Sequence, residues 1–199
     1  MHVNSLSDAF RFQSKLLFIG AMAFAMLTPL WAASPEQVGS EPAPVYGIRI
    51  PSGYRDWTLI SVASVGAPVN DTRAKLGNDV AISAYRQDKT PFPDGTIIVR
   101  LAYKQATSQE GNEAVGREAL ARGLSPDAVE KLLSGSFVAG PAINIQFMVK
   151  DSRKYASTAG WGFAEFTDGK PSGEAVHNTC FACHAPAKDH DYVFTRYAR

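Results

Sequence analysis

The chain has 199 residues, with 20 basic and 19 acidic side chains, 45% hydrophobic residues and two cysteines. This length suits one domain with a substantial core, and the composition excludes a disordered chain, a collagen-like repeat and a disulfide-dense miniprotein. A formal net charge of +1 gives no basic excess of the kind seen in nucleic-acid-binding proteins, so we expect no nucleic-acid partner.

Residues 1–33 have the pattern of a secretory signal peptide. Arg11 and Lys15 precede an uncharged apolar run over 16–30, and small residues follow it. The run has about 15 residues, short of the ~20 that span a bilayer. Because Trp31 disturbs the cleavage pattern, an uncleaved membrane anchor is the alternative. We expect cleavage and a periplasmic location for the mature protein.

A segment rich in Pro, Ser and Glu follows over 34–46, and we expect it to be a flexible leader to a domain over 47–199. Apolar segments with β-branched or alternating residues predict four strands, at 57–65, 96–103, 142–150 and 161–166. Turn signals separate these strands, at 91–95, 140–141 and 168–171.

Helical signals are fewer. Asn78 is placed to cap a short helix that runs to about residue 86. A second helix is predicted over 113–122, and a third starts at Ser125, which is followed by proline and an acidic residue. The last two form a helical pair inserted between strands. The sum is one α+β domain, mainly an antiparallel β-sheet with a few short helices.

The two cysteines form the motif C-x-x-C-H with Cys180, Cys183 and His184, the attachment signature of c-type haem. In such a site each thiol adds to one haem vinyl group, and the histidine ligates the iron from the proximal side. A zinc site normally needs four ligands, and there is no second cysteine pair. No βαβ pattern supports a thioredoxin-like site. A structural disulfide is the plainest alternative.

Small electron-transfer cytochromes usually add a methionine as the second axial ligand. Met148 is the only candidate after the signal segment, and its place in a predicted strand favours core packing. His177 and His190 flank the motif, and we expect both to be polar surface residues. All three stay open as sixth ligands. The sequence favours a five-coordinate iron with an open distal face, which suits small-molecule binding better than electron transfer alone.

The C-terminal run CFACHAPAKDHDYVFTRYA resembles the end of cytochrome P-460 proteins, in which an acidic residue and V-F-T-R-[FY] follow the haem motif. Three more segments agree with that family: GYRDW at 53–57, DGT at 94–96 and VKDS at 149–152. The resemblance implies a mainly antiparallel β fold, one covalently attached haem c in the C-terminal segment, and a homodimer.

The family has two branches. In the cytochromes P-460 proper, a lysine is cross-linked to the haem and the protein oxidises hydroxylamine. In the related cytochromes c′-beta the cross-link is absent and the haem binds nitric oxide or carbon monoxide. The cross-linking lysine corresponds to Arg100, which is a poor nucleophile, and Lys104 is about 13 Å further along the strand. The family's distal glutamate corresponds to Gln146.

These departures favour ligand binding over hydroxylamine oxidation, and they predict no cross-link at position 100. Arg100 is a candidate for the distal pocket or for a haem propionate, Gln146 for a distal hydrogen-bond donor, and Arg196 for a propionate. We expect an exported mono-haem cytochrome that binds or transforms nitric oxide or hydroxylamine. Whether it is an oxidoreductase stays open. The alternative is a periplasmic electron-transfer cytochrome, for which a soluble redox partner is expected.

Overall fold

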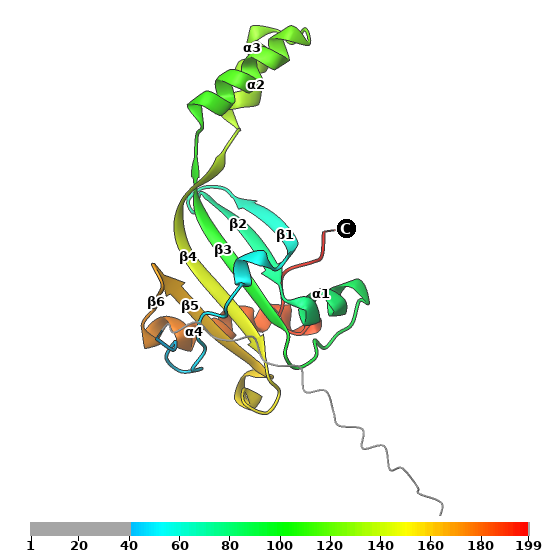
Figure 1. The fold of residues 1–199 in the computed structure, drawn as a ribbon, viewed down its shortest axis with the longest axis vertical. Helices are drawn as coiled ribbons and strands as arrows, with labels where there is room; N and C mark the ends of the chain where they lie inside the picture. Colours follow the sequence, from blue (N-terminus) through cyan, green and yellow to red (C-terminus); the bar gives the residue numbers. More distant parts are fainter. Residues whose placement is uncertain (1–40, 199) are drawn as a thin grey trace, which may run out of the picture. The chain divides into compact units, whose positions relative to one another are not determined.

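The structure, a computed structural model, describes residues 41–198. The predicted signal peptide (1–33) and the first part of the predicted leader lie outside these residues. Six strands form one antiparallel sheet in sequence order (Figure 1). They are β1 (Thr58–Val65), β2 (Asp71–Gly77), β3 (Ile97–Ala106), β4 (Val138–Lys150), β5 (Trp161–Thr167) and β6 (Lys170–Pro171). The predicted α+β class is confirmed.

Four α-helices and three short 3₁₀ helices accompany the sheet. The α-helices are α1 (Asp79–Arg86), α2 (Gln109–Ala121), α3 (Pro126–Ser134) and α4 (Glu174–His184). The 3₁₀ helices are η1 (Tyr54–Asp56), η2 (Ala156–Thr158) and η3 (Ala185–His190). Among the described residues, no helix combines the length and the apolar character needed to cross a membrane.

Capping explains why the first and third helices were predictable. The Asn78 side chain accepts a hydrogen bond from the Ala81 amide at 3.0 Å, as an N-cap does, and α1 starts at the next residue. Ser125 caps α3 in the same way. The helix α2 starts earlier than predicted because Ser108 is its cap, accepting from the Gly111 amide at 3.1 Å.

Two strands were not predicted as such. The strand β2 reads DTRAKLG, and its apolar positions Ala74 and Leu76 alternate with Arg73 and Lys75, so the run is too short and polar for a clear signal. The segment 168–171, expected as a turn only, contains the two-residue strand β6.

The sheet has a hydrophobic cluster on each face, because successive side chains of a strand point to opposite sides. One cluster includes Val99, Phe147 and Phe166. The other packs α1 and the C-terminal segment against Ile98 and Phe163, with Cys180 and Phe181 at its margin. We call the face that carries Ile98 and Phe163 the motif face.

Part of the segment predicted as a leader is packed on the domain. Ala43 is buried, and its amide donates to the Ile48 carbonyl at 2.7 Å. The Tyr46 ring lies edge-on to Tyr155 and Phe163, at 5.8 and 5.7 Å between centroids. Contacts with the core therefore begin before residue 47.

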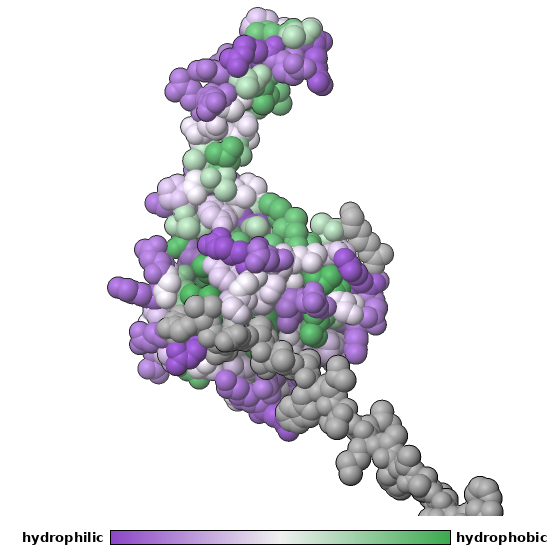
Figure 2. All heavy atoms as spheres, viewed as in Figure 1, coloured by the Kyte–Doolittle hydropathy of each residue, from purple (hydrophilic) through white to green (hydrophobic). Residues whose placement is uncertain are grey.

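The helices α2 and α3 lie at the end of a ribbon formed by β3 and β4, whose pairing extends to Ala106 and Val138. They pack on each other, with Leu133 and Val129 near Gly116, which confirms the inserted helical pair (Figure 1). Hydrophobic side chains are exposed in this part of the chain and are interspersed with hydrophilic ones (Figure 2).

We expect Gly162→Ala to destabilise the protein, because an added Cβ would lie 2.4 Å from Cζ of Tyr155. The Tyr155 ring cannot move away freely, since it is buried and its hydroxyl donates to the Tyr46 carbonyl at 3.2 Å. Overpacking of this kind costs about 1–3 kcal/mol of unfolding free energy, measurable by urea denaturation. The control is Gly66→Ala, where a Cβ meets no atom within 4 Å; equal stability of the two variants would contradict the prediction.

Candidate functional site

The helix α4 presents the C-x-x-C-H motif in its last two turns. Cys180, Cys183 and His184 stand at i, i+3 and i+4, so they share one helix face. The helix packs on β5, with the Phe181 ring 6.4 Å from that of Phe163. Both cysteines are free thiols in this structure, and the alternative disulfide is not formed.

His184 is held with one ring nitrogen available. The Tyr192 carbonyl lies 2.8 Å from Nδ1 and can only accept, so Nδ1 carries the proton and Nε2 has a free lone pair. The ring contacts Phe163 and Phe194 at 5.0 and 5.3 Å between centroids. Burial lowers the pKa of His184, and the charge of Arg100 lowers it further against the effect of the Tyr192 bond. A neutral imidazole of this tautomer is suited to ligate a metal through Nε2.

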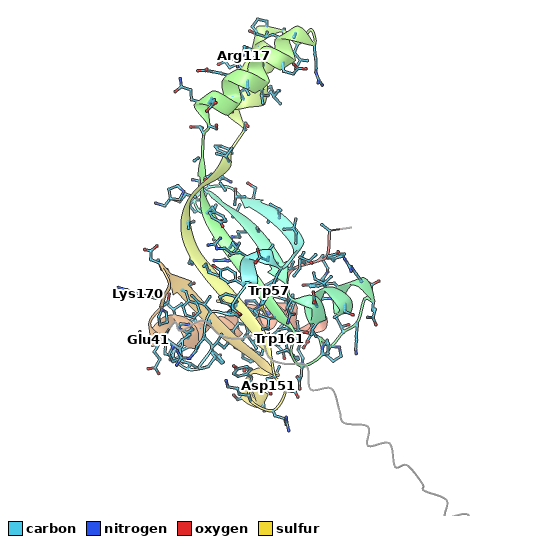
Figure 3. The ribbon with its side chains drawn as sticks, in the orientation of Figure 1. Glu41, Trp57, Arg117, Asp151, Trp161 and Lys170 are labelled. Atoms are coloured by element: carbon cyan, nitrogen blue, oxygen red, sulfur yellow. The ribbon has the colours of Figure 1, made fainter. Side chains whose placement is uncertain are left out.

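A buried ion pair holds the turn that supplies this carbonyl. Asp191 and Tyr192 both have positive φ, 53° and 64°, a conformation that is costly without surrounding support. Lys150 donates to both carboxylate oxygens of Asp191 at 2.8 and 2.9 Å, and the Phe92 amide donates to the same carboxylate at 2.8 Å. Figure 3 shows Trp161, whose ring lies 4.8 Å from the Lys150 ammonium, at this end of the sheet.

The thiol of Cys180 is half-buried beside an acidic side chain. Burial raises its pKa to about 11, and the charges of Glu165 and Cys183 add to the effect. The thiol is therefore protonated at neutral pH and is a weak nucleophile.

We expect the haem-free Cys183→Ala variant, in which Cys180 is the sole thiol, to be alkylated slowly at pH 8. Because only the thiolate reacts, the rate should rise about tenfold per pH unit up to a pH well above the ordinary thiol pKa of about 8.5. Mass spectrometry of iodoacetamide-treated samples measures this rate. A plateau near pH 8.5 would contradict the prediction.

On the motif face, four side chains form a row across the sheet. Cross-strand pairing puts Lys75 of β2 opposite Arg100 of β3, Arg100 opposite Gln146 of β4, and Gln146 opposite Glu165 of β5. We call these four residues the polar row. The register thus brings the predicted residues Arg100 and Gln146 side by side.

Arg100 is only partly satisfied within the row. Its Nη2 donates to Oδ1 of Asn144 at 2.8 Å, while its Nε is buried and has no hydrogen-bond partner. Burial lowers the pKa of Arg100, with a further contribution from Arg73. One guanidinium donor is therefore uncommitted in a desolvated position.

Gln146 is engaged with a carboxylate that the sequence analysis missed. Its amide Nε2 donates to Oε2 of Glu165, and the hydroxyl of Ser172 donates to Oε1 at 2.8 Å. Position 146 itself lacks a carboxylate, but the adjacent strand supplies one. No signal in the sequence links these residues, because strand pairing relates them.

His177 is not the surface residue that we predicted; it is fully buried. Its Nε2 accepts from the Glu165 amide at 3.0 Å, which ties α4 to β5, and its Nδ1 faces the carbonyl of Gly173, the N-cap of α4, at 3.0 Å. His190 is exposed, as predicted. Met148 packs at the margin of the motif-face cluster that also includes Cys180.

Arg196 is exposed on the C-terminal segment and lines a cavity of about 280 Å³ with Tyr85, Phe92 and Tyr197. This cavity contains neither His184 nor any residue of the polar row. Nη1 of Arg196 donates a long hydrogen bond of 3.4 Å to the Val193 carbonyl. The structure therefore does not bring Arg196 together with the other predicted site residues.

Comparison with protein families shows that residues 51–195 match the family described as cytochrome P460. The matched range contains the motif, the polar row and the Lys150–Asp191 pair. The search of curated proteins gave no match.

Proposed function

Because the chain belongs to the cytochrome P460 family, and is therefore a haem protein, we propose that it is an exported mono-haem c-type cytochrome that binds or transforms nitric oxide or hydroxylamine. Cys180 and Cys183 hold the haem covalently, and His184 ligates its iron. The observation that carries the proposal is the state of His184. Its Nδ1 proton is bound by the Tyr192 carbonyl, which leaves Nε2 for the metal.

The residues present fit a haem. Two free thiols and a neutral imidazole share one face of α4, and that helix packs on the face carrying the polar row. The Nε of Arg100 is buried and has no hydrogen-bond partner. Buried donors are nearly always hydrogen-bonded in folded proteins, so this atom indicates a group that binds there. When bound, the haem supplies an iron atom that takes small ligands and exchanges electrons.

The chain's own residues then define the distal side. With haem bound, the buried Nε of Arg100, which has no partner within the chain, would be available to an oxygen atom of the haem or of its ligand, while Nη2 donates to Asn144. Gln146 would orient Glu165 with one amide hydrogen, which leaves its second N–H as the predicted distal donor. Arginine at position 100 argues for a haem without a cross-link, which supports ligand binding over hydroxylamine oxidation.

Other parts of the proposal rest on the family resemblance and the sequence alone. They are the periplasmic location after removal of residues 1–33, a homodimer, a soluble redox partner, and a propionate contact for Arg196. Because Arg196 is exposed, its side chain can reach a haem propionate outside the cavity that it lines.

An absorption spectrum of the reduced protein, before and after addition of nitric oxide, tests the proposal. We expect a high-spin ferrous haem that takes up nitric oxide readily. A red-shifted ferrous Soret band, together with a haem-linked peptide from residues 96–104, would instead indicate a cross-linked hydroxylamine oxidase. A six-coordinate low-spin spectrum that changes in Met148→Leu would support the electron-transfer alternative, since Met148 and Cys180 pack against the same cluster.

A further inference from the structure

Two cations are held side by side in the polar row. Lys75 and Arg100 are directly opposite each other on β2 and β3, and Arg73 lies two residues from Lys75 on the same face. Like charges in directly opposite positions of neighbouring strands repel each other. Both side chains are also partly buried, which weakens the screening of this repulsion by water.

The neighbouring acids, Asp71 and Glu165, offset the charge of this pair only in part, because both are bonded to other side chains. Asp71 is committed to Arg73, whose Nε donates to both carboxylate oxygens at 2.9 and 2.8 Å. Glu165 receives Gln146 and Ser172. In the part of the chain that the structure describes, no salt bridge reaches Lys75 or Arg100.

The pKa values of Lys75 and Arg100 are both lowered, as expected for buried cations that lack a full counter-charge. The pKa of Lys75 is lowered by burial first and by Arg73 and Arg100 next. The pKa of Arg100 is lowered by burial first and by Arg73 next. The single neutral contact of Arg100 to Asn144 leaves its Nε buried without a partner.

The geometry points to an anion site in which Lys75 and Arg100 bind the oxygen atoms of a carboxylate or small oxyanion on the motif face. This inference deepens the proposed function and rests on it, because the same face carries Cys180 and His184. A guanidinium supplies directed donors to such oxygens, and an ammonium adds a mobile point charge. The same two cations disfavour a positively charged ligand. The anion has two possible sources, a haem propionate or a free nitrogen oxyanion such as nitrite.

Nitrite titration of the haem-loaded protein at low ionic strength distinguishes the sources. It is followed by the Soret band, by calorimetry and by the midpoint of thermal unfolding. If the site takes free nitrite, Lys75→Met and Arg100→Gln each weaken binding about tenfold or more, and added salt weakens binding to the wild-type protein. The matched control is Lys104→Met, which removes an exposed lysine four residues from Arg100 on β3 and leaves nitrite affinity unchanged.

If the site holds a propionate, nitrite affinity is the same in all four proteins. Lys75→Met and Arg100→Gln then shift the propionate bending bands in resonance Raman spectra, whereas Lys104→Met does not. The inference is overturned if the first two variants match Lys104→Met in nitrite affinity, Raman bands and nitrite-dependent thermal shift.

Nitric oxide uptake by the same wild-type samples keeps the two proposals separate. If the iron takes up nitric oxide but Lys75→Met and Arg100→Gln change neither nitrite affinity nor the propionate bands, the proposed function stands and the anion site is excluded. Failure of the iron to take nitric oxide, with a nitrite-induced thermal shift that depends on Lys75, overturns the proposed function and supports the anion site.

Discussion

Replacing Lys150 with methionine should lower the free energy of unfolding by about 3–5 kcal/mol, the largest loss that we expect from a single change in this chain. The Lys150 and Asp191 side chains are only 7% and 9% exposed, so the variant leaves a buried carboxylate without its counter-charge. The lost ammonium also donates to the Ala159 carbonyl at 3.1 Å. Urea denaturation followed by circular dichroism measures the loss.

The same variant should also disturb His184, the proposed iron ligand. Asp191 and Tyr192 keep their left-handed conformations beside this ion pair, and Tyr192 orients His184. We therefore expect a changed haem spectrum or reduction potential under conditions where the variant remains folded. Lys154→Met is the control, because the Lys154 side chain is exposed and its ammonium lies over the Tyr155 ring, away from any buried carboxylate. A loss below about 1 kcal/mol, similar to the control, would be evidence against a stabilising role for the buried pair.

The second large effect concerns the haem itself. With Cys180 and Cys183 both replaced by alanine, no haem should remain on the polypeptide after denaturing electrophoresis, whereas the wild-type chain should retain one haem per chain. Denaturation separates covalent attachment from tight binding, because only thioether-linked haem resists it. Peroxidase staining of the gel and intact-protein mass spectrometry measure the retained haem.

Substitution of His184 separates attachment from ligation. His184→Ala should keep any haem that is attached but lose the proximal ligand, which changes the ferrous spectrum in native protein. His190→Ala is the matched control, since it removes an exposed histidine six residues further along the chain. Haem retained on the double cysteine variant after denaturation would be incompatible with thioether attachment. An unchanged spectrum in His184→Ala would exclude His184 as the ligand.

Local signals account for the parts of the fold that were predictable. The start of α1 follows from Asn78, because an asparagine before a helix-forming run accepts hydrogen bonds from the first free amides of the helix. The strands β3 and β5 were predicted from apolar patterns that need no knowledge of their neighbours. By contrast, α4 was missed because its sequence, EAVHNTCFACH, is rich in residues of modest helix propensity and lacks a capping side chain.

The sequence by itself predicted the class of cofactor site, because the spacing of Cys180, Cys183 and His184 is a local property of a few residues. The family match supports a haem cofactor. Only the tertiary structure decided what surrounds that site. Strand register places Lys75, Arg100, Gln146 and Glu165 in one row across four strands. The carbonyl that orients His184 lies in a turn held by an ion pair between residues 150 and 191. Such contacts join segments that are distant in the chain, where periodicity and capping carry no information about which side chains meet.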